Sequence, residues 1–214
     1  RIFLKIVLTL TVSEYTTQLL SFEEYSFSLD EAMDNTSKGA TAVRRELSRL
    51  IEKKKVFNLR KGFYLIIPPR YSNLNKLPVQ LYADKLFKYL NRKYYLGLYT
   101  AAKLHGASHQ KIQHDYFIIE APKLININKG FYNIQFHTTS NWPKGNIESK
   151  RSDAGVYHTA SPSLTFVDLI HYHSKVGGMN RMLASLEELT EELVEQDLEL
   201  LIGWYENKSA LQRM

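Results

Sequence analysis

Apolar residues recur at helical spacing over residues 40–51, the clearest pattern in the chain. The apolar positions stand at i, i+3, i+7, i+10 and i+11 and are Ala40, Val43, Leu47, Leu50 and Ile51. At 100° per residue they share one face, so we predict a helix that buries this stripe. The period then changes at about residue 56. "VFNL" and "GFYLII" predict two strands of a hairpin that turns at Arg60-Lys61-Gly62 and ends before two prolines.

Two helices are predicted before this stretch. "SEYTTQLLSFEEY" (13–25) favours a helix with Ser13 as N-cap. "SLDE" (28–31) has the pattern of a capping box, in which Ser28 and Glu31 satisfy each other's backbone amides, and it predicts a short helix to about residue 33. Thr36 or Ser37 is expected to cap the helix that follows.

A polar linker at 70–76 is the predicted domain boundary, and the pattern beyond it is mixed. Helices are predicted from Leu77-Pro78, over 94–106 and after Ser161, which is the expected N-cap of "PSLTFVDLI". "YFIIEA", "FYNIQFHTT" and "GVYHTA" predict strands. From residue 179 the chain is expected to be helical. The fold class is therefore α+β, with a first domain at 1–70 and a mixed α/β domain at 77–214.

The distribution of charged residues is most informative in the first predicted domain. The net charge of the 214 residues is +6, and basic residues concentrate over 38–61, whereas seven acidic residues fall within 187–199. Two helices followed by a basic hairpin have the order of a winged helix-turn-helix, whose second helix enters the DNA major groove. The residues expected to contact DNA are Lys38, Thr41, Arg44, Arg45, Ser48, Arg49, Lys53, Lys55, Arg60 and Lys61.

These residues are expected to play different parts on double-stranded DNA. Arg45 and Arg49 lie opposite the apolar stripe, and arginine reads guanine with two hydrogen bonds. Lys38 and the amides at the helix start are expected to face phosphate. The lysines at 53–55 and the hairpin tip would neutralise phosphates without reading sequence.

A second basic surface is expected in the next segment. It combines tyrosines with Lys85, Lys88, Arg92, Lys93 and Lys103. Stacking and charge together would suit single-stranded nucleic acid or a partner. Half-buried tyrosines beside solvated lysines are the alternative interpretation.

Candidate catalytic chemistry is sparse. The chain has no cysteine, which excludes disulfides and thiolate zinc sites and fits a cytoplasmic location. Asp115, Glu120 and Lys123 approach a nuclease pattern, but three residues and a proline separate the glutamate from the lysine, so the two should not point the same way. Asp168, inside an apolar helix, is expected to anchor a hydrogen bond or salt bridge. We expect no enzyme activity, no cofactor and no metal.

The histidines form no recognised ligand set. His105 and His109 straddle a glycine, and His171 and His173 stand two apart in a predicted helix, where their side chains point apart. The apolar N-terminal segment 1–12 is too short to span a bilayer and lacks a signal-peptide pattern, so we expect neither membrane insertion nor export. Its role stays open. The start at Arg1 and the end without a polar tail favour a longer natural chain.

Three phrases in this order resemble the AbiEi family of antitoxins: "AVRRELSRLIEKKKVFNLRKGFYLIIPPRY", "YYLGLYTAAKLHGASHQ" and "GVYHTASPSLTFVDLI". The resemblance spans about residues 28–197. It implies a type IV toxin–antitoxin system of abortive phage infection. The recognition helix would lie in 38–55 and the wing in 56–67, so that the protein represses its own operon at an operator expected to hold inverted repeats.

The resemblance also implies a partner for the second domain. That domain would neutralise a nucleotidyltransferase-like toxin without forming a stable complex. The alternative is an ordinary winged-helix regulator whose second domain senses a ligand or dimerises. A gene for such a toxin directly downstream would favour the antitoxin.

Overall fold

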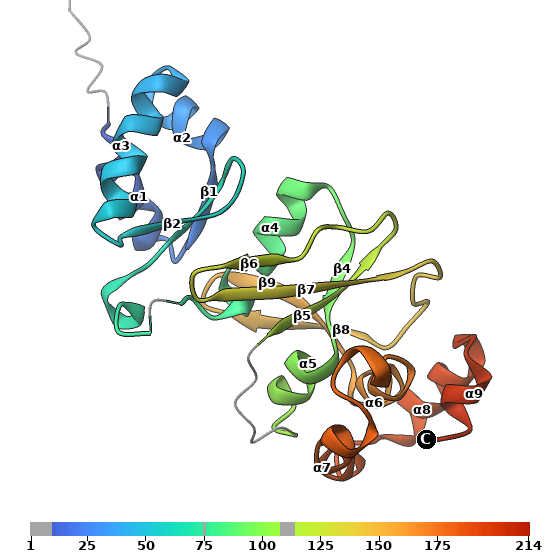
Figure 1. Ribbon diagram of the computed structural model, residues 1–214. Coiled ribbons are helices and arrows are strands. Elements are labelled where there is room, and N and C mark those ends of the chain that lie inside the picture. The colour runs from blue at the N-terminus through green and yellow to red at the C-terminus, as the bar shows by residue number, and fades with distance from the viewer. Residues whose placement is uncertain (1–9, 75, 108–113) are drawn as a thin grey trace, which may run out of the picture. The chain divides into compact units, whose positions relative to one another are not determined.

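The computed structural model describes residues 10–74, 76–107 and 114–214, which form two compact units (Figure 1). The first unit runs to Leu90 and takes in Ser152–Gly155, and the second comprises Asn91–Arg151 and Val156–Met214. Both units contain helices and strands, and in the second unit a run of five strands, β5 to β9 over residues 115–160, is followed by a run of helices, so the predicted α+β class is confirmed. Among the described helices, none has the length and apolar character needed to cross a membrane.

The first unit combines short helices with a small antiparallel sheet of order β1–β3–β2. Its elements are α1 (Val12–Ser21), β1 (Ser26–Ser28), α2 (Leu29–Thr36), α3 (Ala40–Glu52), β2 (Val56–Arg60), β3 (Phe63–Ile66) and α4 (Ala83–Leu90). The predicted hairpin is confirmed as β2 and β3, and Gly62 between them has φ +75°, a conformation that glycine adopts without strain. Strand β1 was not predicted, since three residues carry too short a pattern.

Side-chain caps decide where the first two helices begin. The capping box of Ser28 and Glu31 at the start of α2 is confirmed. Helix α1 also begins at a capping box, but Thr11 and Glu14 form it, so the prediction of Ser13 as N-cap is wrong. Ser13 lies inside the first turn, two residues past the N-cap position from which a side chain can reach the free amides.

Helix α3 has no side-chain cap. Its N-cap is Gly39, and the prediction of Thr36 or Ser37 is wrong because Thr36 is the buried last residue of α2 while Ser37 ends α2 in a left-handed conformation (φ +53°). The predicted apolar stripe is confirmed at Val43, Leu47 and Leu50, which are buried against α1, α2 and the sheet. Ile51, at the edge of the stripe, is exposed.

The second unit is built on a mixed six-stranded sheet of order β6–β7–β5–β4–β9–β8. Its strands are β4 (Tyr94–Leu96), β5 (Asp115–Glu120), β6 (Ile127–Lys129), β7 (Tyr132–Thr139), β8 (Ile147–Ser152) and β9 (Gly155–Ala160). The three predicted strands are confirmed as β5, β7 and β9. Neighbours β5 and β7 run parallel, as do β4 and β9, whereas β4 and β5 run antiparallel.

Helices gather on one side of this sheet (Figure 1). They are α5 (Leu98–Leu104), α6 (Pro162–His171), α7 (Met179–Thr190), α8 (Glu195–Trp204) and α9 (Lys208–Leu211). The second unit's core joins their apolar faces to Tyr95, Tyr116 and Ile118 of the sheet. Ser161 caps α6 as predicted, its hydroxyl accepting from the amide of Leu164 at 3.2 Å.

The predicted helix over 94–106 is correct only in its second half. Residues Tyr94–Leu96 form the central strand β4, and Gly97 and Leu98 separate it from α5. Tyr95 pairs with Ile118 of β5, so contacts with distant residues override the local helical pattern.

The two compact units divide after Leu90, further along than the predicted linker at 70–76. Helix α4 groups with the first unit, where Lys85 contacts Glu24 at 2.6 Å and Glu31 at 3.3 Å. The hydroxyl of Tyr89 also donates to the carbonyl of Lys61 at 3.1 Å. The assignment of domains to 1–70 and 77–214 concerns independent folding and stays a prediction.

Candidate functional site

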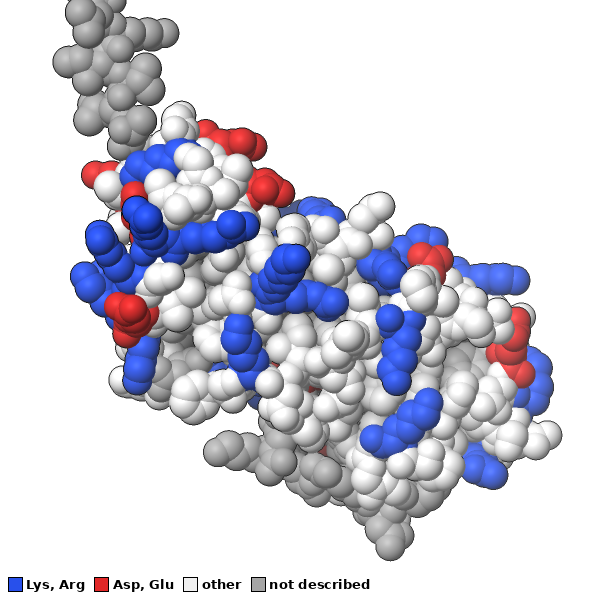
Figure 2. Space-filling view, turned by 45° about the horizontal axis from the view of Figure 1, so that its top comes forward, with Lys and Arg blue, Asp and Glu red and all other residues white. Residues whose placement is uncertain are grey.

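The outward face of α3 carries the polar and basic residues predicted to contact DNA. All five predicted positions within the helix are exposed: Thr41, Arg44, Arg45, Ser48 and Arg49. They stand opposite the buried stripe, because the helix repeats every 3.6 residues. Figure 2 shows Lys and Arg side chains gathered at the upper left, over the first unit. The helix thus presents three arginines to solvent, with Thr41 and Ser48 beside them.

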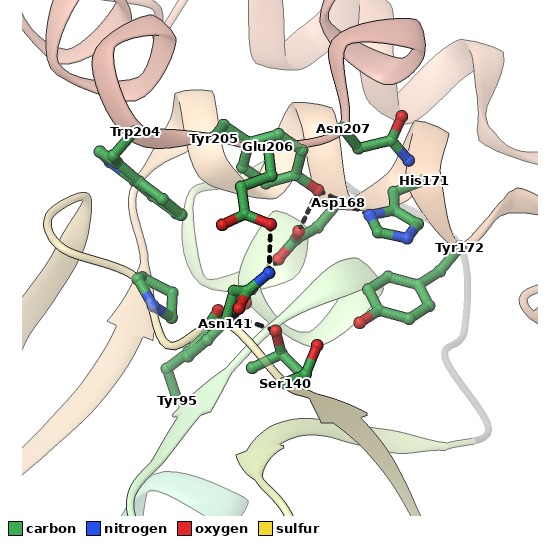
Figure 3. A pocket seen from close by; sticks show the side chains of 12 residues that line it. Tyr95, Ser140, Asn141, Asp168, His171, Tyr172, Trp204, Tyr205, Glu206 and Asn207 are labelled. Atoms are coloured by element: carbon green, nitrogen blue, oxygen red, sulfur yellow. Dashed lines mark hydrogen bonds between the residues drawn. The ribbon is translucent and has the colours of Figure 1, made fainter.

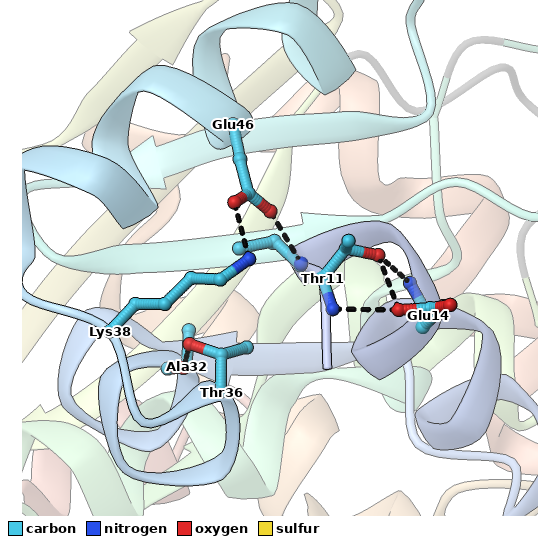
Figure 4. A network of polar contacts seen from close by, with 7 residues as sticks. Thr11, Glu14, Ala32, Thr36, Lys38 and Glu46 are labelled. Atoms are coloured by element: carbon cyan, nitrogen blue, oxygen red, sulfur yellow. Dashed lines mark hydrogen bonds and ion pairs between the residues drawn. The ribbon is translucent and has the colours of Figure 1, made fainter. Parts of the chain in front are cut away.

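Lys38 does not share this free face, since its charge is paired inside the unit (Figure 4). Its Nζ lies 2.6 Å from Oε1 of Glu46, and Oε2 of Glu46 accepts from the amide of Val12 at 2.7 Å. Burial acts to raise the pKa of Glu46, but these two hydrogen bonds outweigh it and the pKa lies below its usual value. Lys38 therefore helps to tie α3 to the start of α1.

The basic residues after α3 are mostly free in solvent. Lys53, Lys55 and Lys61 are exposed. Arg60 differs, since it is half-buried at an irregularity in the β2–β3 pairing, and its Nη1 is buried without a hydrogen-bond partner among the described residues. A guanidinium nitrogen in that position is a strong donor left unused.

The second predicted basic surface is largely engaged in contacts. Lys85 pairs with glutamates of the first unit, Lys88 with Asp84 at 2.7 Å, and Lys93 lies 3.5 Å from Glu120. Arg92 donates to the carbonyls of Glu120 and Pro122. Lys103, on α5, is exposed. Lys85 and Lys88 belong to the first unit and the others to the second. The expectation of a nucleic-acid or partner surface stays a prediction.

A cavity of about 300 Å³ opens in the second unit (Figure 3). Strand β4, the loop after β7, helix α6 and the α8–α9 junction supply its lining. The lining residues are Tyr95, Thr139, Ser140, Asn141, Pro143, Asp168, His171, Tyr172, Trp204, Tyr205, Glu206 and Asn207. The cavity therefore has aromatic walls and a few polar groups, the usual make-up of a small-molecule site.

Asp168 forms the polar floor of this cavity, and its predicted role as a hydrogen-bond anchor is confirmed. Its Oδ2 accepts from the hydroxyl of Tyr95 at 2.8 Å and its Oδ1 from that of Tyr205 at 3.0 Å. Burial raises the pKa of Asp168 to about 7, although both hydroxyls favour its charged form. The two tyrosines come from distant elements and no local pattern indicated them.

His171 extends this network toward solvent. Its Nδ1 lies 2.9 Å from the hydroxyl oxygen of Tyr205. Because the single hydroxyl hydrogen of Tyr205 goes to Asp168, Nδ1 of His171 is the donor of this contact and Nε2 is left as an acceptor. Burial, together with the charge of Lys175, lowers the pKa of His171. The side chain is therefore neutral near pH 7.

The candidates for metal or nuclease chemistry are not brought together. Among the described residues, no three His, Cys, Asp or Glu side chains gather in a way that would hold a metal ion. His109 lies outside the described residues. Asp115 and Glu120 stand at the two ends of β5, five residues apart, which puts them on opposite faces of the strand. Lys123 is exposed beyond it.

Fold and site define an α+β protein with a basic helical face in one unit and an aromatic, acidic cavity in the other. Residues 95–214 match the family model described as the AbiEi antitoxin C-terminal domain. The match covers more than half of the chain, so the chain belongs to the AbiEi antitoxin family. No curated protein matches it.

The family gives the protein its general role: it is an antitoxin of a toxin–antitoxin system, and a cognate toxin is implied. Two of the three phrases that carried the resemblance fall in or at the edge of the matched region, which confirms the resemblance there. The first phrase, over 42–71, lies outside it.

Proposed function

We propose that this antitoxin binds operator DNA through a winged helix-turn-helix in its first unit and represses its own operon. Helix α3 is the recognition helix and the β2–β3 hairpin is the wing. Three helices packed on one core, with a sheet of order β1–β3–β2, support this assignment. The exposed basic face of α3 is the observation that carries it, because the buried stripe leaves that face free to enter a major groove.

The start of α3 and the wing are suited to phosphates. No side chain caps α3, so its first amides stay available to an anion at the positive end of the helix dipole. Lys53, Lys55 and Lys61 are exposed and supply positive charge for the phosphates, whereas Nη1 of Arg60 is buried and does not face them. Because Lys38 is paired with Glu46, its phosphate contact would require that pair to open.

Binding to the protein's own promoter tests this proposal. Fluorescence anisotropy should show tighter binding to that promoter than to random DNA, and a promoter–reporter fusion should be repressed by the intact chain. Lys61→Ala at the wing tip should weaken binding to both DNAs and lower the slope of log K against log salt by about one. Lys208→Ala, in the second unit, is the matched control and should change neither. Equal affinity for promoter and random DNA would contradict operator recognition.

We further propose that the second unit neutralises a nucleotidyltransferase-like toxin without a stable complex. The family match falls on this unit, which supports placing the antitoxin activity there. Co-expression should rescue growth from the toxin while size-exclusion chromatography of the two purified proteins shows separate peaks. A co-eluting complex would contradict the second half of the proposal.

We also propose that the protein acts in the cytoplasm, in defence against phage, and without catalysis. The opposite orientation of Asp115 and Glu120 supports the absence of nuclease chemistry, because two-metal hydrolysis needs converging carboxylates. The purified protein should not cleave DNA or RNA with Mg²⁺. Cleavage that disappears in Glu120→Gln would place the protein among nucleases instead.

A further inference from the structure

The cavity above Asp168 has a composition that selects for charge. Two carboxylates line it, Asp168 on the floor and Glu206 at the rim, and no lysine or arginine is among the described residues that line it. Neither carboxylate forms an ion pair with another described residue. Glu206 therefore brings a negative charge that no described residue pairs with, and Asp168 adds its own charge above its pKa of about 7. Such a site attracts cations and repels phosphates.

The aromatic residues in the cavity walls favour ligands with a flat, planar group. Tyr95, Tyr172 and Tyr205 contribute rings, and the ring of Tyr172 stacks on that of His171 with centroids 4.6 Å apart and planes 8° apart. Aromatic faces attract cations, and a planar guanidinium gains more from them than a rounded ammonium, since it also stacks.

The unused acceptors surround the same space (Figure 3). Glu206 receives one hydrogen bond, from Nδ2 of Asn141, and retains acceptor capacity on its carboxylate. Nε2 of His171 is an acceptor on the other side of the opening. A ligand that fits must therefore bring several donors in one plane, as a guanidinium does with its five N–H groups.

We propose that this cavity binds a guanidinium cation, with Glu206 and Asp168 supplying the charge and the aromatic walls the stacking face. Two sources share this chemistry, a free small guanidine and an arginine side chain of a partner protein. The same unit favours the protein side chain, because it exposes further carboxylates on α7, on α8 and between them, which would attract a positively charged partner: Glu187, Glu191, Glu192, Glu195 and Glu199.

The two tryptophans of the chain provide a direct readout. Trp204 lines the cavity and donates its indole N–H to Oδ1 of Asn146 at 2.6 Å, whereas Trp142 does not line it. In the intact ¹⁵N-labelled protein, Trp142→Phe assigns the two indole signals. Titration with N-acetyl-arginine amide should shift the Trp204 signal to saturation, with Kd between about 0.1 and 10 mM. Higher salt should weaken binding.

Comparison ligands separate the alternatives. If the site binds an arginine of a partner protein, a short peptide with one arginine among lysines should bind more tightly than N-acetyl-arginine amide. If the site binds a free small guanidine, the peptide should bind more weakly than N-acetyl-arginine amide. N-acetyl-lysine amide should bind more weakly than the arginine compound. Adenosine should not saturate the signal, and tighter binding of adenosine would replace this proposal with a nucleobase site.

Variants test the assigned role of the rim carboxylate. Glu206→Gln keeps the size of this exposed side chain and removes its charge, so the affinity for N-acetyl-arginine amide should fall about fivefold. Glu52→Gln, which removes an exposed carboxylate of the first unit, is the matched control and should leave the affinity unchanged. No saturable shift in the parent protein, or equal affinities in parent and Glu206→Gln, would overturn the proposal.

Discussion

Asp168 shows how one buried carboxyl can shape the behaviour of a whole unit. It lies 3% exposed in α6, where two tyrosine hydroxyls donate to its oxygens and, within the described part of the chain, no lysine or arginine forms an ion pair with it. Its pKa of about 7 in the folded protein exceeds the ordinary value of 3.8. Between these two pH values the folded chain holds a proton that the unfolded chain has released, so the free energy of unfolding must fall as pH rises.

Asp168→Asn should remove this dependence. In urea unfolding followed by circular dichroism, the parent protein should lose stability from about pH 4 to about pH 7, by on the order of 4 kcal/mol at most from this group. The variant should lack that part of the slope, because asparagine does not titrate. Identical pH slopes in the two proteins would show that Asp168 is ionised throughout.

Substitutions of Arg45 and Arg49 test whether these two side chains recognise bases of the operator DNA. Both side chains point away from the buried stripe of α3. Alanine at either position should weaken operator binding by roughly 1–3 kcal/mol and random-DNA binding much less, because bidentate contacts to guanine are lost only on the operator. Anisotropy titrations on both DNAs measure this. Equal losses would reassign the arginine to the phosphate backbone.

At the scale of elements, capping boxes at Thr11 and Ser28 place the starts of α1 and α2. Thr11→Ala should lower the free energy of unfolding by about 1 kcal/mol, because Oγ1 of Thr11 accepts from the amide of Glu14 at 3.1 Å. Ser13→Ala, two residues on and exposed, is the matched control and should change it by less than about 0.5 kcal/mol. If chemical denaturation showed a larger loss of stability for Ser13→Ala than for Thr11→Ala, Ser13 would be the N-cap instead.

Local signals explain which elements the sequence predicted. The box at Ser28, the cap at Ser161 and the turn at Gly62 are complete within a few residues, and all three are confirmed. Strand β4 was mistaken for helix because its partners lie far along the chain, with Leu96 beside Thr159. The cap of α3 was misplaced because α2 runs further than predicted: Thr36 is its last residue, with a hydroxyl that donates to the carbonyl of Ala32, and Ser37 ends it.

The whole molecule adds what no segment shows alone. The cavity joins Tyr95, Asp168 and Tyr205, which come from β4, α6 and the end of α8. Only Asp168 attracted notice in the sequence, as a charge inside an apolar helix. The charge asymmetry between 38–61 and 187–199 is visible in the sequence, and the structure assigns those segments to separate compact units.

This separation predicts that repression and toxin protection divide between the two parts of the chain. Expressed from an inducible promoter, residues 77–214 should protect cells from the toxin but not repress the antitoxin promoter. Residues 1–70 should repress without protecting, more weakly if the second unit dimerises. A 77–214 fragment that is folded by circular dichroism yet fails to protect would contradict the division.

A full-length variant tests the same prediction without requiring a fragment to fold on its own. Helix α4 contacts the first unit through Lys85, so cutting the chain before it removes the partners Glu24 and Glu31. The double variant Arg45→Ala/Arg49→Ala keeps every such contact and changes only exposed side chains. It should lose repression in the reporter assay and keep full protection in the growth assay, because neither arginine lies in the region matched to the antitoxin family. If protection fell together with repression, toxin neutralisation would depend on DNA binding and the two functions would be one.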